Sequence, residues 1–202
     1  MQSTFAWLPG LCTIILCVGC NSSIVHDVNE LSAYVSDKDN GLTYERYKNG
    51  LKMRVTYKPT EQMVYEELRD EILTPDRVSE LTEKYDKFHY VVFSLSSGSK
   101  EVLHDEKLSI EHYGDLVQTL SFQMGEFVQL VTPSDTIPVF DFALNRTFGL
   151  SQSTDLLFAF SSEKTKDAPW IDFYVEEFGF GFEKQGFRFR REDLASIPII
   201  EP

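Results

Sequence analysis

The chain confines its cysteines to one short stretch. All three, Cys12, Cys17 and Cys20, lie within the first 20 of 202 residues, and none follows. A domain in an oxidising compartment is best served by paired cysteines or by none, because an unpaired thiol reacts there. Whatever folds after Cys20 therefore has no disulfide, no cysteine-bound metal and no thiolate nucleophile. Its stability must come from a packed core, for which 42% hydrophobic and 13% aromatic residues are sufficient.

An apolar segment precedes the last of these cysteines. It runs from Phe5 to Val18, is interrupted by Pro9, Gly10 and Thr13, and is followed by the small residue Gly19. A membrane-spanning helix needs about 20 apolar residues, whereas a shorter apolar region before a small residue is typical of a signal peptide. We therefore expect residues 1–19 to be a removed signal peptide, 20–28 a tether, and 29–202 a single globular domain.

The residues around the expected cleavage point carry a second signal. Leu16-Cys17-Val18-Gly19-Cys20 resembles a bacterial lipobox, in which a cysteine is acylated and the chain is cut just before it. The resemblance implies lipidation of Cys20; the alternative is an ordinary secretory peptide in which this cysteine is incidental. Asn21 follows it, which by resemblance to lipoprotein sorting rules favours the outer membrane. The periplasmic face and the cell surface both stay open.

The net charge of −13 limits the partners of the domain. Residues 1–19 contain no charged side chain, so the remaining chain carries all of it. Binding to nucleic acid depends on Lys and Arg displacing counterions from phosphates, and docking on an anionic membrane surface needs the same residues. We therefore expect no nucleic-acid partner, and we expect the membrane to be reached through a lipid anchor.

The first half of the domain mixes helical and strand patterns. Residues 29–35 predict a helix, and residues 36–41 a turn. Residues 51–57 alternate strictly and predict a half-buried strand that Pro59 ends. Two helices are expected next, one capped by Thr60 with Val64, Leu68 and Ile72 on one face, and one that begins at Thr74-Pro75. A strand over 89–96 and a third helix over 109–120 complete this half.

In the second half of the domain, apolar and polar residues alternate with a period of two. Strands are expected over 127–131, 136–144, 156–161, 170–175 and 178–189, with hairpin turns at 133–135 and 184–186. The predicted fold is therefore α+β, with a largely antiparallel sheet or sandwich and two or three helices in the N-terminal half. In the last hairpin the aromatic side chains would form one face, used for core packing or as a platform for sugars: Phe178, Phe180, Phe182, Phe187 and Phe189.

No residue pattern specifies a metal, a cofactor or a catalytic group. Asp37, Asp39 and Asn40 lack the spacing of a calcium loop and predict a solvated turn. The segment from His104 to His112 holds zinc-binding residue types without a metal-site spacing. S-x-x-K occurs twice without its partner motifs, and Gly179-Phe180-Gly181 is not a dinucleotide fingerprint.

Two weaker features remain open. A glycosidase needs two carboxylates in one cleft, and the first candidates are Asp172 with Glu176 or Glu177, near Trp170. Asp135-Thr136-Ile137 resembles the short site at which Bacteroidota attach O-glycans to exported proteins, which makes Thr136 a candidate glycosylation site.

Several short sequence segments together resemble a broad group of Bacteroidota outer-membrane lipoproteins of unknown function. The resemblance implies an exported, anchored protein and carries no activity or site residue with it. The segments span most of the domain: residues 31–35, 39–42, 55–59, 146–150, 157–160 and 197–198.

Three functions follow as hypotheses. The first is an envelope lipoprotein that binds a protein or glycan partner without catalysis, since no catalytic signature is present. The second is an anchored hydrolase that acts on polysaccharide through paired carboxylates. The third is a structural component of a surface or conjugation-type assembly.

Overall fold

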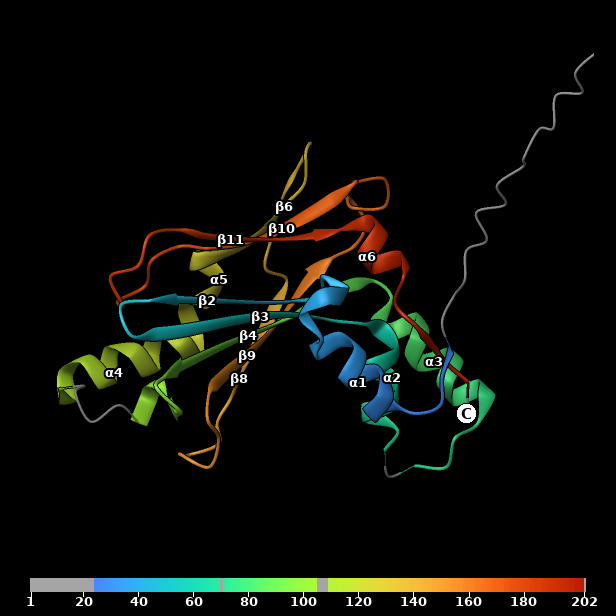
Figure 1. Cartoon of the computed structure of the whole chain (residues 1–202), viewed down its shortest axis with the longest axis horizontal. Coiled ribbons are helices and arrows are strands. Elements are labelled where there is room, and N and C mark those ends of the chain that lie inside the picture. The colour runs from blue at the N-terminus through green and yellow to red at the C-terminus, as the bar shows by residue number, and fades with distance from the viewer. Residues whose placement is uncertain (1–23, 70, 105–108, 202) are drawn as a thin grey trace, which may run out of the picture.

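The computed structural model describes residues 24–69, 71–104 and 109–201. The predicted signal peptide and the predicted lipidation of Cys20 lie outside these residues. Within them the chain forms an α+β fold, as the sequence predicted, in which two antiparallel sheets pack face to face (Figure 1).

The N-terminal helices begin largely where the sequence placed them. Helix α1 (Val28–Ser36) is capped by Asp27, whose carboxylate accepts hydrogen bonds from the backbone N–H of Asn29 and Glu30 at 2.7 and 2.9 Å. Its apolar face is fully used, because Leu31 and Val35 are buried. A short 3-10 turn, η1 (Lys38–Asn40), follows in the segment predicted as a turn.

Helices α2 (Thr60–Glu67) and α3 (Pro75–Tyr85) confirm two predicted helices, with two corrections to α2. The hydroxyl of Thr74 caps α3 as expected by accepting from the N–H of Arg77. Thr60, however, is the first residue of α2 and not its cap, and α2 ends before Ile72, which is 87% exposed. The spacing of Ile72 matched a helical face, but the chain leaves the helix before reaching it.

The first sheet has the strand order β2-β3-β4-β9-β8, with β5 paired to β4, and every neighbouring pair is antiparallel. Strands β3, β4 and β9 were predicted, whereas β2 was not. The strands are β2 (Thr43–Lys48), β3 (Leu51–Lys58), β4 (Phe88–Ser97), β5 (Lys100–Glu101), β8 (Asp141–Asn145) and β9 (Thr154–Ser161).

The second sheet has the order β11-β10-β6-β7 and is also antiparallel. Its strands are β6 (Val128–Val131), β7 (Thr136–Pro138), β10 (Trp170–Val175) and β11 (Gln185–Arg190). The prediction of a single strand over residues 136–144 is therefore wrong. Its first part, β7, pairs in the second sheet, and its last part, β8, pairs in the first, so the chain changes sheet between them.

The hairpin expected over 178–189 is also wrong. Gly179 and Gly181 have φ of 118° and 69°, which breaks a strand ladder. The N–H groups of residues 179, 180 and 181 donate to Glu177 Oε1 at 2.6, 2.5 and 2.8 Å, so a carboxylate replaces the partner strand. The predicted turn at Gln185 and Gly186 lies instead within β11, which pairs with β10.

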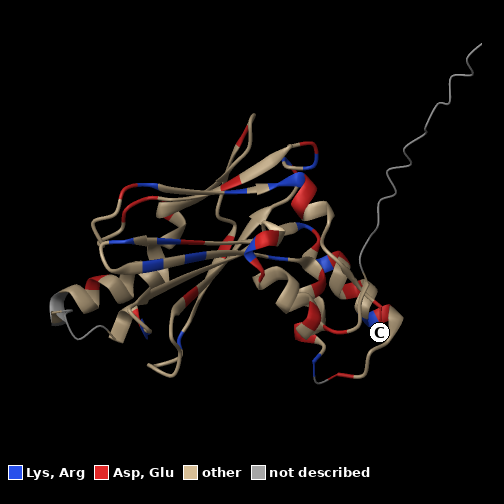
Figure 2. Cartoon of the chain, in the orientation of Figure 1, with Lys and Arg blue, Asp and Glu red and all other residues tan. Residues whose placement is uncertain are grey.

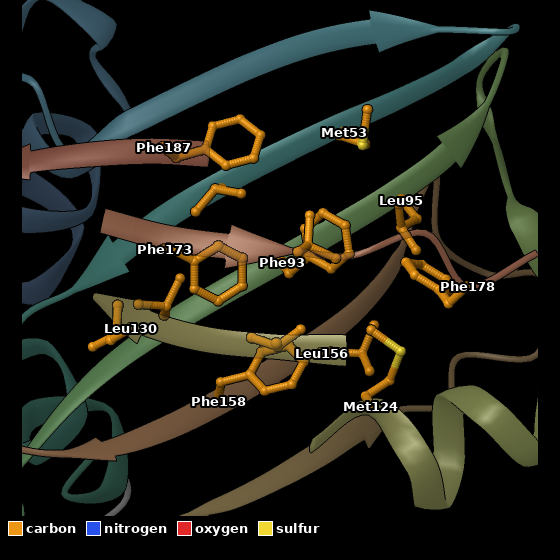
Figure 3. Close-up of a cluster of buried hydrophobic side chains, with 14 of the residues drawn as sticks. Met53, Phe93, Leu95, Met124, Leu130, Leu156, Phe158, Phe173, Phe178 and Phe187 are labelled. Atoms are coloured by element: carbon orange, nitrogen blue, oxygen red, sulfur yellow. The ribbon is translucent and has the colours of Figure 1, made fainter. Parts of the chain in front are cut away.

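The main core fills the space between the two sheets. Phe93 and Phe158 of the first sheet point toward Phe173 of the second, with ring centroids 6.0 and 5.8 Å from it (Figure 3). Phe187 joins them and is almost fully buried. The phenylalanines of the expected aromatic face thus serve the core rather than a surface platform, since four of the five are buried.

Helical segments cover the two ends of the sandwich (Figure 1). At one end lie α4 (Ile110–Gln118), the π-helical turn η3 (Thr119–Gln123) and α5 (Met124–Phe127), which bury Leu116, Leu120 and Met124. The 3-10 turn η2 (Val102–His104) precedes them. Helices α1 to α3 lie at the other end, with α6 (Arg191–Ala195). There β1 (Ile24–Val25) pairs in parallel with β12 (Ile199–Ile200). Among the described residues, no helix has the length and apolar character needed to cross a membrane.

Candidate functional site

A cavity of about 360 Å³ opens at the end of the sandwich near α2, α3 and α6. Its lining comes from five separate parts of the chain: the junction of β3 and α2, the junction of α3 and β4, the 162–168 loop, the start of β10, and α6. Both sheets contribute, through His89 and Ile171 for example. The site is therefore assembled only when the sandwich closes.

A second hollow of about 540 Å³ adjoins this cavity. The two share four lining residues, Asp86, Phe88, Ser162 and Lys166. Phe140 lines the second hollow, is 69% exposed, and packs its ring against that of Phe88 with centroids 4.6 Å apart. We refer to the cavity and the adjoining hollow together as the aromatic groove.

His89 lies at the inner wall of the groove and uses both ring nitrogens. Its Nδ1 is 2.9 Å from the hydroxyl of Tyr57, and its Nε2 is 2.6 Å from Oγ1 of Thr165. The Thr165 hydroxyl donates to the carbonyl of Ser162 at 2.8 Å, so its oxygen is left to accept from Nε2–H. Nδ1 must then accept from Tyr57. The four groups form one directed chain of hydrogen bonds, which fixes the tautomer of a neutral imidazole.

The surroundings keep this histidine neutral. Burial lowers the pKa of His89 to about 4, and the nearby carboxylate of Asp86 offsets only part of this effect. Burial likewise raises the pKa of Tyr57 well above its ordinary value. Neither group is therefore a ready proton donor or acceptor toward a ligand near neutral pH.

Charged side chains stand on the wall of the first cavity. Among the described residues that line it, Asp86 provides one carboxylate, and Lys166 and Arg191 provide two cations. Arg191 Nε donates to the carbonyl of Ala168 at 3.0 Å, which holds its guanidinium against the loop. In a chain with a net charge of −13, this wall carries a local excess of positive charge.

Each carboxylate proposed for a glycosidase pair is instead bound to another group outside the groove. Asp172 is buried and receives a bidentate contact from Arg188, with both N–O distances 2.8 Å. Glu176 pairs with Lys184 at 2.6 Å, and Glu177 holds the 179–181 turn. None of the three acids lines the groove.

Trp170, named with those acids, does line the groove. The guanidinium of Arg188 lies over its ring, 3.9 Å from the centroid, and so fixes the indole by a cation–π contact. Arg188 therefore joins Asp172 to Trp170 and gives the groove a rigid aromatic wall.

The weaker metal candidates do not converge. His104 Nδ1 lies 3.3 Å from Glu101, and His112 lies beside Ser109, 2.8 Å from its hydroxyl. Across residues 24–69, 71–104 and 109–201, no group of three or more metal-ligating side chains comes together. Asp105 and Glu106 lie outside the described residues. The calcium-like segment is a turn, in which Asp37 accepts from the N–H of Asp39.

Thr136 is the exposed first residue of β7, and the next residue, Ile137, is buried. Its side chain is thus open to solvent beside the turn at 133–135. Glycosylation at Thr136 stays a prediction, as does lipidation of Cys20.

Sequence reasoning missed most of the groove. Phe140 was expected within a continuous strand, and Lys166 carried no motif. His89 stood alone in the sequence, and its partners Tyr57 and Thr165 are 32 and 76 residues away. Only Trp170 was singled out beforehand, by its residue type.

Comparisons with protein-family models, with curated proteins and with solved structures each gave no match. A functional assignment therefore rests on the geometry of the groove.

Proposed function

We propose that this chain is a noncatalytic, glycan-binding lipoprotein of the bacterial envelope, with the aromatic groove as its binding site. The observation that carries the proposal is the row of aromatic walls formed by Trp170, Phe88 and the largely exposed Phe140 along two adjoining hollows.

The chemistry of the groove suits a sugar chain. Sugar rings have apolar C–H faces that pack on aromatic rings, and hydroxyl groups at their edges that need hydrogen-bond partners. The groove offers both, since Ser162, Lys166 and Asp86 are shared by the two hollows. Cavities of about 360 and 540 Å³ fall within the size range of small-ligand sites, roughly 300–1,000 Å³. A folded protein partner would instead need a broad surface.

The absence of a catalytic role is argued from the same residues. Glycoside hydrolysis uses two acids that face each other across one cleft. Among the described residues Asp86 is the one carboxylate that lines the inner cavity, whereas Glu83 and Glu163 line only the adjoining hollow. His89 is neutral and both its nitrogens are bonded to hydroxyl groups. His89 therefore positions the wall of the groove and is not an activated base toward a ligand.

Tryptophan fluorescence provides a direct test. The sequence has two tryptophans, Trp7 and Trp170, so a chain that starts at residue 21 reports from the groove alone. Titration with oligosaccharide fragments of envelope polysaccharides is expected to shift the emission of Trp170 in a saturable way. Phe140→Ala should weaken this binding about tenfold, the effect of about 1.4 kcal/mol of lost ring contact.

Phe122→Ala is the matched control, because Phe122 is 79% exposed and lines neither hollow. It is expected to bind as the unaltered chain does. The proposal of glycan binding fails if no oligosaccharide changes the emission, or if the two alanine variants behave alike.

The anchor is tested separately, on the full chain in bacterial membranes. Mass spectrometry of the mature N-terminus is expected to find an acylated Cys20, and Cys20→Ser should release the protein from the membrane fraction. An unacylated N-terminus would refute the anchor and leave the groove untouched as a binding site.

A further inference from the structure

The outer face of the first sheet holds a cluster of cations around one acid. Glu45 on β2 is contacted by Lys38 at 2.6 Å, by Lys52 at 2.8 Å and by Arg54 at 2.6 Å. Figure 2 shows basic residues along β2 and β3, in a chain that is acidic overall. One carboxylate contacts three cations, so this cluster by itself carries an excess of positive charge.

A hollow of about 160 Å³ lies beside this cluster. Lys52 and Arg54 line it from β3, and Ser96 and Ser94 line it from the neighbouring strand β4. The register places Lys52 opposite Ser96 and Arg54 opposite Ser94. Residues that face each other across paired strands project from the same side of a sheet, so two hydroxyls and two cations meet at one place.

Ser96 is the most informative of these residues. It is only 7% exposed, and its hydroxyl makes no hydrogen bond within the described chain, although it lines the hollow. Its hydroxyl oxygen is not one of the fully buried polar atoms that lack a partner, so it is open to the hollow and can donate to a ligand group there. Two acids lie across the ladder. Glu101 is opposite Ser96 and accepts from the N–H groups of Gly149 and Ser151 at 2.9 and 3.1 Å, and Asp155 is opposite Ser94 and accepts from Ser153 at 2.8 Å. Neither acid lines the hollow, whose described lining includes Lys52 and Arg54 and no carboxylate.

We infer that this hollow is a binding site for a small oxoanion, the phosphate or sulfate group of a ligand. Its oxygens would accept hydrogen bonds from the hydroxyls of Ser96 and Ser94, and they would pair with Lys52 and Arg54 in competition with Glu45. The volume is less than half that of the inner cavity and suits a compact group rather than a chain. The site lies on the face of the first sheet opposite the sandwich core and is independent of the aromatic groove.

Calorimetric titration of the chain starting at residue 21 tests the inference, with inorganic phosphate and sulfate at constant ionic strength set by chloride. Saturable binding is expected for one or both. Ser96→Ala and Arg54→Gln should each weaken it about tenfold, the usual effect of losing one hydrogen bond to a charged group.

Glu45→Gln should change binding in the opposite direction. It removes the competing carboxylate and should tighten the oxoanion severalfold. Arg46→Gln is the control for net charge, because Arg46 lies on β2 next to Glu45 and does not line the hollow. Its affinity should match that of the unaltered chain.

The inference is overturned if neither anion binds in a saturable way, or if Arg46→Gln loses as much affinity as Arg54→Gln. If Glu45→Gln does not fold, the comparison of Ser96→Ala with the unaltered chain still decides between a built site and general screening.

Discussion

His89 and Glu45 lie on opposite faces of the first sheet, and both have a lowered pKa for opposite reasons. His89 faces the inner wall of the groove, where burial lowers its pKa to about 4. Glu45 faces outward, where partial burial by itself would raise its pKa, but hydrogen bonds from Lys38, Lys52 and Arg54 lower it to about 2. The histidine is thereby held neutral, and the glutamate is held charged.

The difference lies in the partners that each face supplies. Tyr57 and Thr165 carry neutral hydroxyls, which fix an imidazole but cannot compensate the charge of an imidazolium. The outer face supplies whole positive charges, which more than offset the desolvation of one carboxylate. A buried group is thus neutral or ionised according to its partners, even when the direction of the pKa shift is the same.

The largest expected effect concerns His89. Its pKa is about 4 in the folded chain against an ordinary value of 6.5, so the unfolded chain binds more protons between these values. Its contribution to stability is therefore complete above pH 6.5 and is lost as the pH falls toward 4. Urea unfolding at pH 7 and pH 5 should show a loss of about 2 kcal/mol from this group.

His89→Gln should remove that loss, whereas His112→Gln, at an exposed position, should retain it. If the unaltered chain and both variants lose the same free energy of unfolding between pH 7 and pH 5, the neutral partners of His89 do not set its pKa. Titration of the His89 ring signals by NMR would then measure the pKa of this histidine directly.

The second effect concerns Glu45. Glu45→Gln should lower the free energy of unfolding by about 1–2 kcal/mol at pH 7, a figure reduced because the three cations are partly solvated. The folded-state pKa is lowered, so the advantage of the native glutamate is present above pH 4.5 and is lost as the pH falls toward 2.

Glu80→Gln serves as the reference for an exposed pair, since Glu80 contacts Arg77 at 2.9 Å with a side chain that is 69% exposed. It should change stability by less than about 0.5 kcal/mol. If the two glutamine variants have the same unfolding midpoint in urea, the Glu45 cluster stabilises the fold no more than an exposed ion pair does.

The smallest effect concerns the hydroxyl that orients His89. Tyr57→Phe leaves Nδ1 without its donor and should cost about 1 kcal/mol. Nitrogen NMR should also show that His89 no longer populates one tautomer. If the tautomer is unchanged, Thr165 alone orients the ring, and the directed chain of hydrogen bonds is wrong.

Much of the fold was visible in local patterns. Leu31 to Val35 carry the apolar face of α1, and the alternation of residues 51–57 matches β3 up to Pro59. The cap of α1, Asp27, lies in the segment that was expected to be a tether. Predictions failed where local signals permitted two outcomes. The period-two run over 178–189 fits a hairpin, but Glu177 and two glycines at positive φ form a turn there instead.

The sites could not be predicted in the same way. The groove brings Phe88, Phe140 and Trp170 together from distant parts of the chain, and the register of β3 with β4 places Ser96 beside Lys52. No spacing along the sequence encodes these contacts, because each depends on which strands pair and on where the chain changes sheet.

The sequence by itself determined the α+β class, most helices and strands, the absence of cysteine chemistry after Cys20, and the expectation of an anchored, acidic protein. These properties depend on composition and on local periodicity, which each segment carries alone. The tertiary structure decided which side chains share a cavity, and with it that His89 is neutral and Glu45 charged. The reason is physical: solvation and charge pairing act through distance in space, and only the packed sheets set those distances.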